Sequence, residues 1–272
     1  MKRTILITGC SSGVGKAAAL LFAERGFDVV ATMRDPDKGR DLSALPGIYV
    51  QRMDVTDVGS VEKAIKAGIA YFGSIDVLLN NAGIGVLGGF EAADPALIQQ
   101  QFDTNVFGVM RTIKAILPHF RAKKQGMIIN ISSGVGIIPI PMQSLYDSTK
   151  FALEGFSESL YYELAAIGIR LKIVLPGAIK SNFFHSMRIT DVTDYPDYGT
   201  YQRTVLQNVK KSNEHSGADP RLIAEVIYQA ATDNRNKLRY LAGKDIRLFA
   251  KVRRLLPECL FMRMVKKTFE KS

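Results

Sequence analysis

The sequence is short of cysteine, histidine and long apolar runs. It contains only two cysteines, Cys10 and Cys259, and three histidines that lie far apart in the chain. Two cysteines do not make the disulfide framework of a small secreted domain, and the scattered histidines predict no metal site. The sequence has no run of 18 apolar residues, so we expect no membrane-spanning helix. The N-terminus passes directly into a predicted strand, so we expect no signal peptide. These absences favour a cytoplasmic protein.

The positive charge is concentrated near the C-terminus. The chain has 36 Lys/Arg against 26 Asp/Glu, a net charge of +10. Residues 244–272 hold nine Lys/Arg and three Asp/Glu, so this extension supplies six of the ten charges. Aromatic residues are not interleaved with the cations and no DNA-reading motif is present, so we expect no nucleic-acid binding.

Strand and helix patterns alternate along the chain. Buried-strand patterns lie at 4–8, 29–33, 49–53, 75–79, 127–131, 171–175 and 238–242. Helical patterns between them include 58–71, 95–124, 144–167 and 220–232. This alternation predicts a single α/β domain, with a doubly wound parallel sheet of the Rossmann type between two helical layers. Residues 178–217 are predicted to form an irregular insertion.

A glycine-rich turn follows the first strand. It reads Gly9-Cys10-Ser11-Ser12-Gly13-Val14-Gly15 and opens an amphipathic helix. Such a turn between strand and helix binds dinucleotides, because glycines admit a pyrophosphate and the helix N-terminus offers N–H groups. A tight turn without a ligand is the alternative. The similar run 83–88 is not predicted to bind phosphate, since the next helix begins only near Pro95.

The end of the second strand predicts the cofactor. NAD sites place an acid there for the ribose 2′-hydroxyl, whereas NADP sites use Arg for the 2′-phosphate. Arg34 occupies this place, with Ser11 available from the glycine turn, and we expect Asp35 and Asp37 to turn toward solvent. This favours NADP(H), against the alternative that Arg34 is a solvated loop residue. Asp54, after the third strand, is predicted to meet the adenine amino group.

A possible proton donor lies on the predicted helix 144–167. Tyr146 and Lys150 are four residues apart and therefore point into the same space. The cation is expected to lower the pKa of the phenol from about 10 toward neutrality, where a general acid/base works best. A chance pair on a surface helix is the alternative.

Polar residues at two other places in the chain are candidates for the same site as Tyr146 and Lys150. The strand 127–131 ends at Ser132 and Ser133, either of which could hold a carbonyl oxygen beside the phenol. Asn105 lies inside the predicted helix 95–124, where Asn is a poor helix former, and this invites a functional explanation.

The motifs together resemble the short-chain dehydrogenase/reductase family. They are Thr8-Gly9-x3-Gly13-x-Gly15, Asn80-Asn81-Ala82-Gly83, Ser133, Tyr146-x3-Lys150 and Pro176-Gly177, in register from residue 4 to about 245. The residues of segments 9–13 and 31–35 are similar to those of the 17β-hydroxysteroid and retinol dehydrogenase branch. The resemblance implies NADP(H)-dependent interconversion of an alcohol and a ketone or aldehyde, with a bulky apolar substrate. A non-catalytic NADP-binding regulator of the same fold is the alternative.

The resemblance also assigns residues. It implies Ser133, Tyr146, Lys150 and Asn105 as the catalytic set, with Asn105 holding a water for proton relay. It also selects Ser133 over Ser132, because the family's Ser lies thirteen residues before its Tyr. It implies cofactor contacts at Gly9, Ser11, Ser12, Gly13, Val14, Gly15, Arg34, Asp54, Val55, Asn81, Ala82, Gly83, Tyr146, Lys150, Pro176, Gly177, Ile179 and Ser181. At Ser181 Thr is commoner in the family. A homodimer or homotetramer through the helices 95–124 and 144–167 is implied as well.

Two segments remain outside the shared core. The insertion at about 178–217 carries aromatic and Met side chains that we expect to close over an apolar ligand as a lid, with an ordinary surface excursion as the alternative. The C-terminal extension, about 244–272, predicts two short basic amphipathic helices broken at Pro257. We favour packing of their apolar face on the protein's own core or a second subunit over contact with an anionic membrane.

Overall fold

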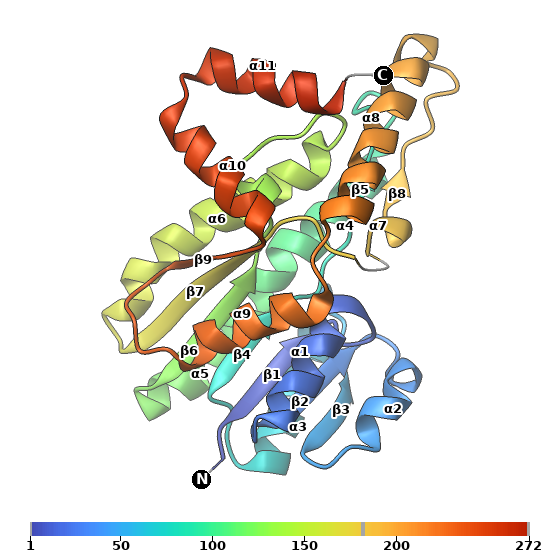
Figure 1. Ribbon diagram of the computed structural model, residues 1–272. Coiled ribbons are helices and arrows are strands. Elements are labelled where there is room, and N and C mark those ends of the chain that lie inside the picture. The colour runs from blue at the N-terminus through green and yellow to red at the C-terminus, as the bar shows by residue number, and fades with distance from the viewer. Residues whose placement is uncertain (1, 181–182, 271–272) are drawn as a thin grey trace.

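A seven-stranded parallel sheet forms the centre of the protein, seen in a computed structural model that describes residues 2–180 and 183–270 (Figure 1). Its strand order is β3-β2-β1-β4-β6-β7-β9. The strands are β1 (Thr4–Thr8), β2 (Asp28–Met33), β3 (Ile48–Arg52), β4 (Val77–Asn80), β6 (Gly126–Ile131), β7 (Ile169–Pro176) and β9 (Arg239–Ala242). The order reverses between β1 and β4, and in such sheets ligands bind at the carboxyl ends beside this switch point.

Helices cover both faces of the sheet, which confirms the three-layer prediction. One face carries α1 (Gly13–Glu24) and α9 (Pro220–Thr232), whose apolar sides share a core cluster with β1 and β2 (Figure 1). The other face carries α3 (Val58–Phe72), α5 (Gly108–Lys123) and α6 (Ser144–Ala165), which share a second cluster. All five side chains of β1 are buried, as expected for a strand covered on both sides.

Short elements connect the layers near the carboxyl edge. They are the 3-10 turns Pro36–Gly39 and Gly134–Gly136, the short helices α2 (Arg40–Ser43), α4 (Pro95–Phe102) and α7 (Phe183–Ser186), and a small two-stranded sheet of β5 (Val86–Leu87) and β8 (Arg188–Ile189). Since α4 begins at Pro95, the run 83–88 opens no helix, in agreement with its rejection as a phosphate turn.

The predicted irregular insertion is wrong in its second half. Residues 196–216 form α8 (Pro196–Ser216), a helix of 21 residues that begins with a proline in its first turn. Only a narrow stripe of this helix is buried, at Gln202, Val205 and Val209. Because the rest of its surface is polar, the apolar pattern of the helix is weak in the sequence.

The predicted helix 95–124 is interrupted in the middle. α4 and α5 are joined by a π-helical segment, Asp103–Phe107, which contains the buried Asn105. Such segments are rare and occur frequently at functional sites.

Two helices follow β9, as the break at Pro257 predicts. They are α10 (Lys244–Leu255) and α11 (Glu258–Phe269), and they lie with α8 at the end of the molecule where the strands' carboxyl ends point (Figure 1). Within the two described ranges, none of the helices combines the length and the apolar character needed to cross a membrane.

Candidate active site

The structure brings Ser133, Tyr146 and Lys150 together at the carboxyl edge of the sheet. Ser133 follows β6 and is hydrogen-bonded to the buried phenol of Tyr146. The Ser133 Oγ also accepts the N–H of Val135 at 3.3 Å. Lys150 places its Nζ 5.7 Å from the centroid of the Tyr146 ring and donates to the Ile131 carbonyl at 3.0 Å. A hydroxyl, a phenol and an ammonium group therefore share one site.

Burial sets the electrostatics of this group. It raises the pKa of Tyr146, the Asp147 carboxylate raises it further, and the hydrogen bond with Ser133 opposes the shift. Burial also lowers the pKa of Lys150 to about 8, against the attraction of Glu154. The lowered pKa expected for Tyr146 is therefore wrong for the chain itself, because burial and the Asp147 carboxylate raise the pKa by more than the Ser133 hydrogen bond lowers it. The phenol therefore stays protonated at neutral pH.

Asp147 is a buried acid that the sequence did not single out. Its Oδ2 accepts the N–H of Ile140 at 2.8 Å, and its Oδ1 has no hydrogen-bond partner among the described residues. Burial raises the pKa of Asp147 to about 8, although the hydrogen bond from Ile140 opposes this. The only sequence signal was an acid directly after the tyrosine in a helix with a buried face.

The side-chain amide of Asn105 ties two parts of the site together. Its Oδ1 accepts the N–H of Ile84 at 2.9 Å, and its Nδ2 donates to the Ile84 carbonyl at 2.8 Å. The Nδ2 also donates to the Thr149 Oγ1 at 3.1 Å. Asn105 therefore fixes the loop after β4 against α6. Its contact on α6 is Thr149, the residue before Lys150.

The glycine turn has the geometry of an anion site. Gly9 and Gly13 have positive φ angles of 77° and 57°, which favour glycine. A Cβ on Gly15 would lie 2.2 Å from the Gly9 carbonyl oxygen, so the turn and the first turn of α1 are in close contact. Ser12, the N-cap of α1, makes no side-chain cap hydrogen bond. The N–H groups at this helix end are thus available to a pyrophosphate, and the residues present fit a dinucleotide.

The loop after β4 supports the glycine turn. The Asn81 Nδ2 donates to the carbonyl oxygens of Thr8 and Gly9, at 2.9 and 3.1 Å. The N–H groups of Asn81 and Ala82 both donate to the Thr8 Oγ1. A Cβ on Gly83 would lie 3.3 Å from the Asn105 Oδ1. The Asn80-Asn81-Ala82-Gly83 motif therefore joins the glycine turn to the π-helical segment that contains Asn105.

The acids after β2 are engaged away from Arg34. The Asp35 carboxylate accepts the N–H of Asp37, and the Asp37 carboxylate pairs with Arg40 at 3.0 Å. Arg34 is exposed at the end of β2, and its charge helps to lower the pKa of Asp54. Among the described residues Arg34 forms no salt bridge, so its guanidinium stands unpaired at the predicted ribose position.

Asp54 and Val55 lie close by, after β3. Burial raises the pKa of the Asp54 carboxyl, but the hydrogen bonds from Thr56 and the charge of Arg34 lower it by more. Val55 is buried against Gly108 of α5, where a Cβ would lie 2.8 Å from the Val55 Cγ2. An ionised Asp54 is free to accept from an amino group.

The loop after β7 is held by the C-terminal extension. Pro176 ends β7, and the Gly177 N–H donates to the Ala242 carbonyl at 3.0 Å. The Asp245 Oδ2 accepts the N–H of Ala178 at 2.9 Å, a contact that no sequence pattern indicated. Ile179 packs against the core, and Ser181, the last predicted cofactor contact, lies outside the described residues.

Part of the insertion lies directly over the phenol. The Phe183 ring is 5.9 Å from the Tyr146 ring, centroid to centroid. Met187 contacts Gly85, where a Cβ would be 2.6 Å from the Met187 Cγ. The insertion therefore places apolar side chains beside the Tyr146 ring and the loop after β4.

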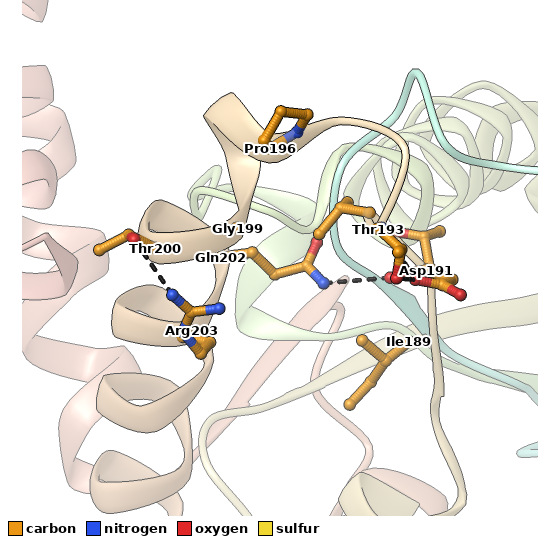
Figure 2. Close-up of a pocket in the computed structure, with 10 residues that line it drawn as sticks. Ile189, Asp191, Thr193, Pro196, Gly199, Thr200, Gln202 and Arg203 are labelled. Carbon is orange, nitrogen blue, oxygen red and sulfur yellow. Dashed lines mark hydrogen bonds between the residues drawn. The ribbon is translucent and has the colours of Figure 1, made fainter.

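A separate pocket lies within the insertion. Figure 2 shows it between the segment 189–193 and the first turns of α8, with Gln202 reaching across to the Thr190 carbonyl and Arg203 bonded to Thr200 within the helix. It is open to solvent, and none of its lining residues belongs to the predicted site. The hydrogen bond from Gln202 to Thr190 joins residues 189–193 to α8 across the pocket.

Comparison with known proteins identifies relatives across the whole chain. The family model described as short chain dehydrogenase matches residues 3–191. An uncharacterized oxidoreductase of Bacillus subtilis, YusZ, is 40% identical over 98% of both chains. A 3-ketodihydrosphingosine reductase of Bacteroides thetaiotaomicron is 35% identical, with 93% of each chain covered. Human retinol dehydrogenase 8 is 35% identical over 87% of this chain and 80% of its own length.

Solved structures agree with these matches. A short-chain dehydrogenase from Streptomyces avermitilis superposes with a TM-score of 0.84 at 31% identity, over 98% of this chain and 97% of its own. ElxO with NADP bound gives 0.72 at 29% identity, over 89% and 98%. A 3-ketoacyl-(acyl-carrier-protein) reductase from Brucella melitensis, complexed with NADH, gives 0.72 at 26% identity, over 89% and 98%. Both nicotinamide cofactors thus occur among proteins that share this fold.

Proposed function

This chain belongs to the short-chain dehydrogenase family, and we propose that it is an NADP(H)-dependent oxidoreductase that interconverts an alcohol with a ketone or aldehyde. The observation that carries the proposal is the contact of a buried, protonated Tyr146 with Ser133, beside Lys150. When bound, the nicotinamide would supply or accept the hydride, and the chain supplies the proton and the geometry.

The proton chemistry follows from the hydrogen bonds of the three side chains. The Ser133 Oγ accepts the Val135 N–H, and its own proton, which contacts the Tyr146 phenol in the chain alone, would turn to the carbonyl oxygen of a bound substrate. Tyr146 would donate its proton to that oxygen during reduction and take it back during oxidation. Lys150 donates one N–H to the Ile131 carbonyl. Its other two N–H groups would hold the ribose, and its charge would stabilise the phenolate that forms.

We assign Asn105 a positioning role. All the hydrogen bonds that its side chain forms with described residues go to Ile84 and Thr149. A relay water of the kind that the family resemblance implies would therefore contact the main chain of Asn105 rather than its amide.

For the cofactor, we propose NADP(H) over NAD(H). The contacts of Asp35 and Asp37 support this, because these carboxylates bond within their own turn and with Arg40, and neither forms a salt bridge with Arg34 among the described residues. Arg34 would bind the phosphate by charge-assisted hydrogen bonds, with Ser11 close in sequence to help. Gly13, Val14 and Gly15 would face the pyrophosphate at the N-terminus of α1.

The proposed substrate is bulky and apolar. Phe183 beside Tyr146 supports this, since an aromatic cover favours an apolar group next to the reacting carbon. Relatives named for a sphingoid ketone and for retinol support the same class.

We further propose a cytoplasmic homodimer or homotetramer. The exposed Phe107 and Phe151, on the elements that the resemblance assigns to subunit contact, support the oligomer. The two cysteines are both free, Cys10 buried and Cys259 exposed, which suits a reducing compartment.

The test is turnover of NADPH with a panel of ketones and aldehydes graded in size and polarity. We expect oxidation of NADPH with bulky apolar carbonyl compounds and slower turnover with NADH. Tight NADPH binding without turnover of any compound would instead favour the non-catalytic regulator.

A further inference from the structure

The C-terminal helices α10 and α11 have an inner face that packs on the protein. This face shares a third core cluster with α8 and the loop around Ile138, and its buried residues are Ile246, Phe261, Val265 and Phe269. The Arg253 guanidinium lies 4.7 Å from the centroid of the Phe261 ring and joins the two helices. Packing on the chain's own core thus accounts for the inner face, as we favoured from the sequence.

Four leucines remain exposed where α10 turns into α11. Leu255 is 80% exposed, Leu248 62% and Leu260 46%, and Leu256 lies beside them at 37%. Leu248 and Leu255 are two turns apart and so lie on one side of α10. We call these four residues the leucine corner. Large apolar side chains exposed together along one short stretch of chain indicate contact with another body.

Cations surround the leucine corner. Residues 244–270 hold eight Lys/Arg and three Asp/Glu, a net charge of +5, which is half of the chain's +10 in a tenth of its length. Lys251, Arg254 and Arg263 are exposed, and none of them forms a salt bridge with a residue that the structure describes. The charge of this surface is therefore not neutralised within the described chain.

We propose that the leucine corner docks on a membrane surface that contains anionic lipid. Leucines enter the boundary between headgroups and acyl chains, while lysines and arginines contact the anionic headgroups. A second copy of the chain fits less well, because a two-fold contact would place two segments of charge +5 against each other. Charge complementarity thus selects the lipid surface.

The docking surface is rigidly joined to the candidate active site. Asp245, in the first turn of α10, binds the Ala178 N–H at 2.9 Å. The next residue, Ile246, packs on Gly134, where a Cβ would lie 2.7 Å from the Ile246 Cδ1. Docking would present the carboxyl edge of the sheet to the bilayer, where an apolar substrate concentrates. This consequence for the substrate rests on the proposed function, whereas docking itself does not.

The same contacts decide how docking is tested. Deletion of the extension would remove Asp245 and Ile246 and disturb the catalytic loops, so point variants of the full chain are used. The full-length protein is sedimented with vesicles of phosphatidylcholine alone, and with vesicles containing 40% phosphatidylserine, at low and high salt. We expect binding only to the phosphatidylserine vesicles, and release at high salt because screening weakens the contact.

Two variants and their matched controls identify the surface. L255S/L260S and R254E should each lower the fraction bound by about tenfold or more. L222S, which changes a leucine that is 49% exposed on α9, and R235E, which changes an exposed loop cation, should leave binding unchanged. Thermal unfolding checks that all four variants are folded.

Three results would overturn the proposal. In the first, the full-length protein does not sediment with phosphatidylserine vesicles at low salt. In the second, the variants and their controls bind equally. In the third, the protein binds vesicles of phosphatidylcholine alone and salt does not reduce this binding. Light scattering that finds an oligomer dissociated by L255S/L260S, without vesicle binding, would assign the corner to a second copy of the chain. Vesicle binding by a protein that fails to turn over any carbonyl compound would support docking and contradict only the proposed function.

Discussion

The Asp147 carboxylate accepts a hydrogen bond from the backbone N–H of Ile140 at 2.8 Å, directly beside the proposed proton donor. This bond joins the start of α6 to the loop that follows Ser133. The loop and the helix therefore hold the hydroxyl and the phenol at a fixed separation.

Asp147 is expected to make folding stability fall as pH rises. Burial raises the pKa of Asp147 to about 8 in the folded chain, from about 4 when unfolded. Between these values the folded state keeps a proton that the unfolded state has lost, so stability falls by up to about 1.4 kcal/mol per pH unit. D147N retains an acceptor for Ile140 but cannot ionise. Its free energy of unfolding, from urea titrations at pH 5, 6.5 and 8, should exceed that of the wild type increasingly as pH rises.

D147A provides the matched comparison for this effect. D147A also cannot ionise, so its free energy of unfolding should vary with pH as little as that of D147N. Because D147A lacks the acceptor for the Ile140 N–H, its free energy of unfolding should be lower at every pH. Parallel pH profiles for the wild type and D147N would show that Asp147 is not a source of the dependence.

Arg34 is expected to set the cofactor preference. R34A should weaken NADPH binding by about 1.5–3 kcal/mol, because the 2′-phosphate loses a charge-assisted hydrogen bond. NADH lacks this phosphate, so its dissociation constant should change little. Titrations that follow cofactor fluorescence measure both, and equal losses for the two cofactors would refute the assignment.

Gly15 is expected to be essential for cofactor binding. In G15A the new methyl group would lie 2.2 Å from the Gly9 carbonyl oxygen and 2.5 Å from the Asn81 Nδ2, so the phosphate turn must move. We expect a loss of NADPH affinity of at least about tenfold, given the close approach that a pyrophosphate needs.

The control for G15A is G155A. Nothing lies within 4 Å of a Cβ on Gly155, which sits inside α6. G155A should retain NADPH binding and raise stability by roughly 0.5–1 kcal/mol, because Ala costs less conformational entropy in a helix than Gly. Equal NADPH affinity for G15A and G155A would contradict the role of the glycine turn.

Phe183 is expected to contribute to substrate selection. Its ring lies 5.9 Å from the Tyr146 ring, so F183A removes apolar surface beside the reacting group. The ratio kcat/KM should fall by about tenfold for a bulky apolar ketone and much less for a small one, in keeping with the apolar area lost. A uniform fall for both would indicate a structural role. Hydrogen exchange of residues 183–217 with and without NADPH and ketone tests closure of the lid separately, since no added protection there would count against it.

Local patterns in the sequence predicted the parts of the site that depend on spacing. The glycine turn after β1 and the four-residue interval from Tyr146 to Lys150 are fixed by helix and strand geometry, so both were predictable. α8 was missed because its buried stripe is narrow and its other sides are polar. The contact between Asp245 and Ala178 joins segments 67 residues apart and leaves no local signal.

The direction of the pKa shift of Tyr146 could not be predicted from the sequence. The interval to Lys150 indicates that a cation is near, and the structure agrees. The extent of burial depends on tertiary packing around the ring, and burial is the larger effect here. Proximity is local information, whereas desolvation is a property of the whole fold.

The most direct test of the proposed function is the turnover of Y146F with NADPH and a bulky apolar ketone. The substitution removes the proton donor and leaves the ring against Phe183 in place. We predict a fall in kcat of about 10²–10⁴-fold, the range expected for loss of a general acid. The NADPH dissociation constant should stay within about twofold of wild type, because the phenol acts on the substrate, whereas K150A should impair both. Substantial kcat in a folded, NADPH-binding Y146F would contradict the assignment of Tyr146 as the acid.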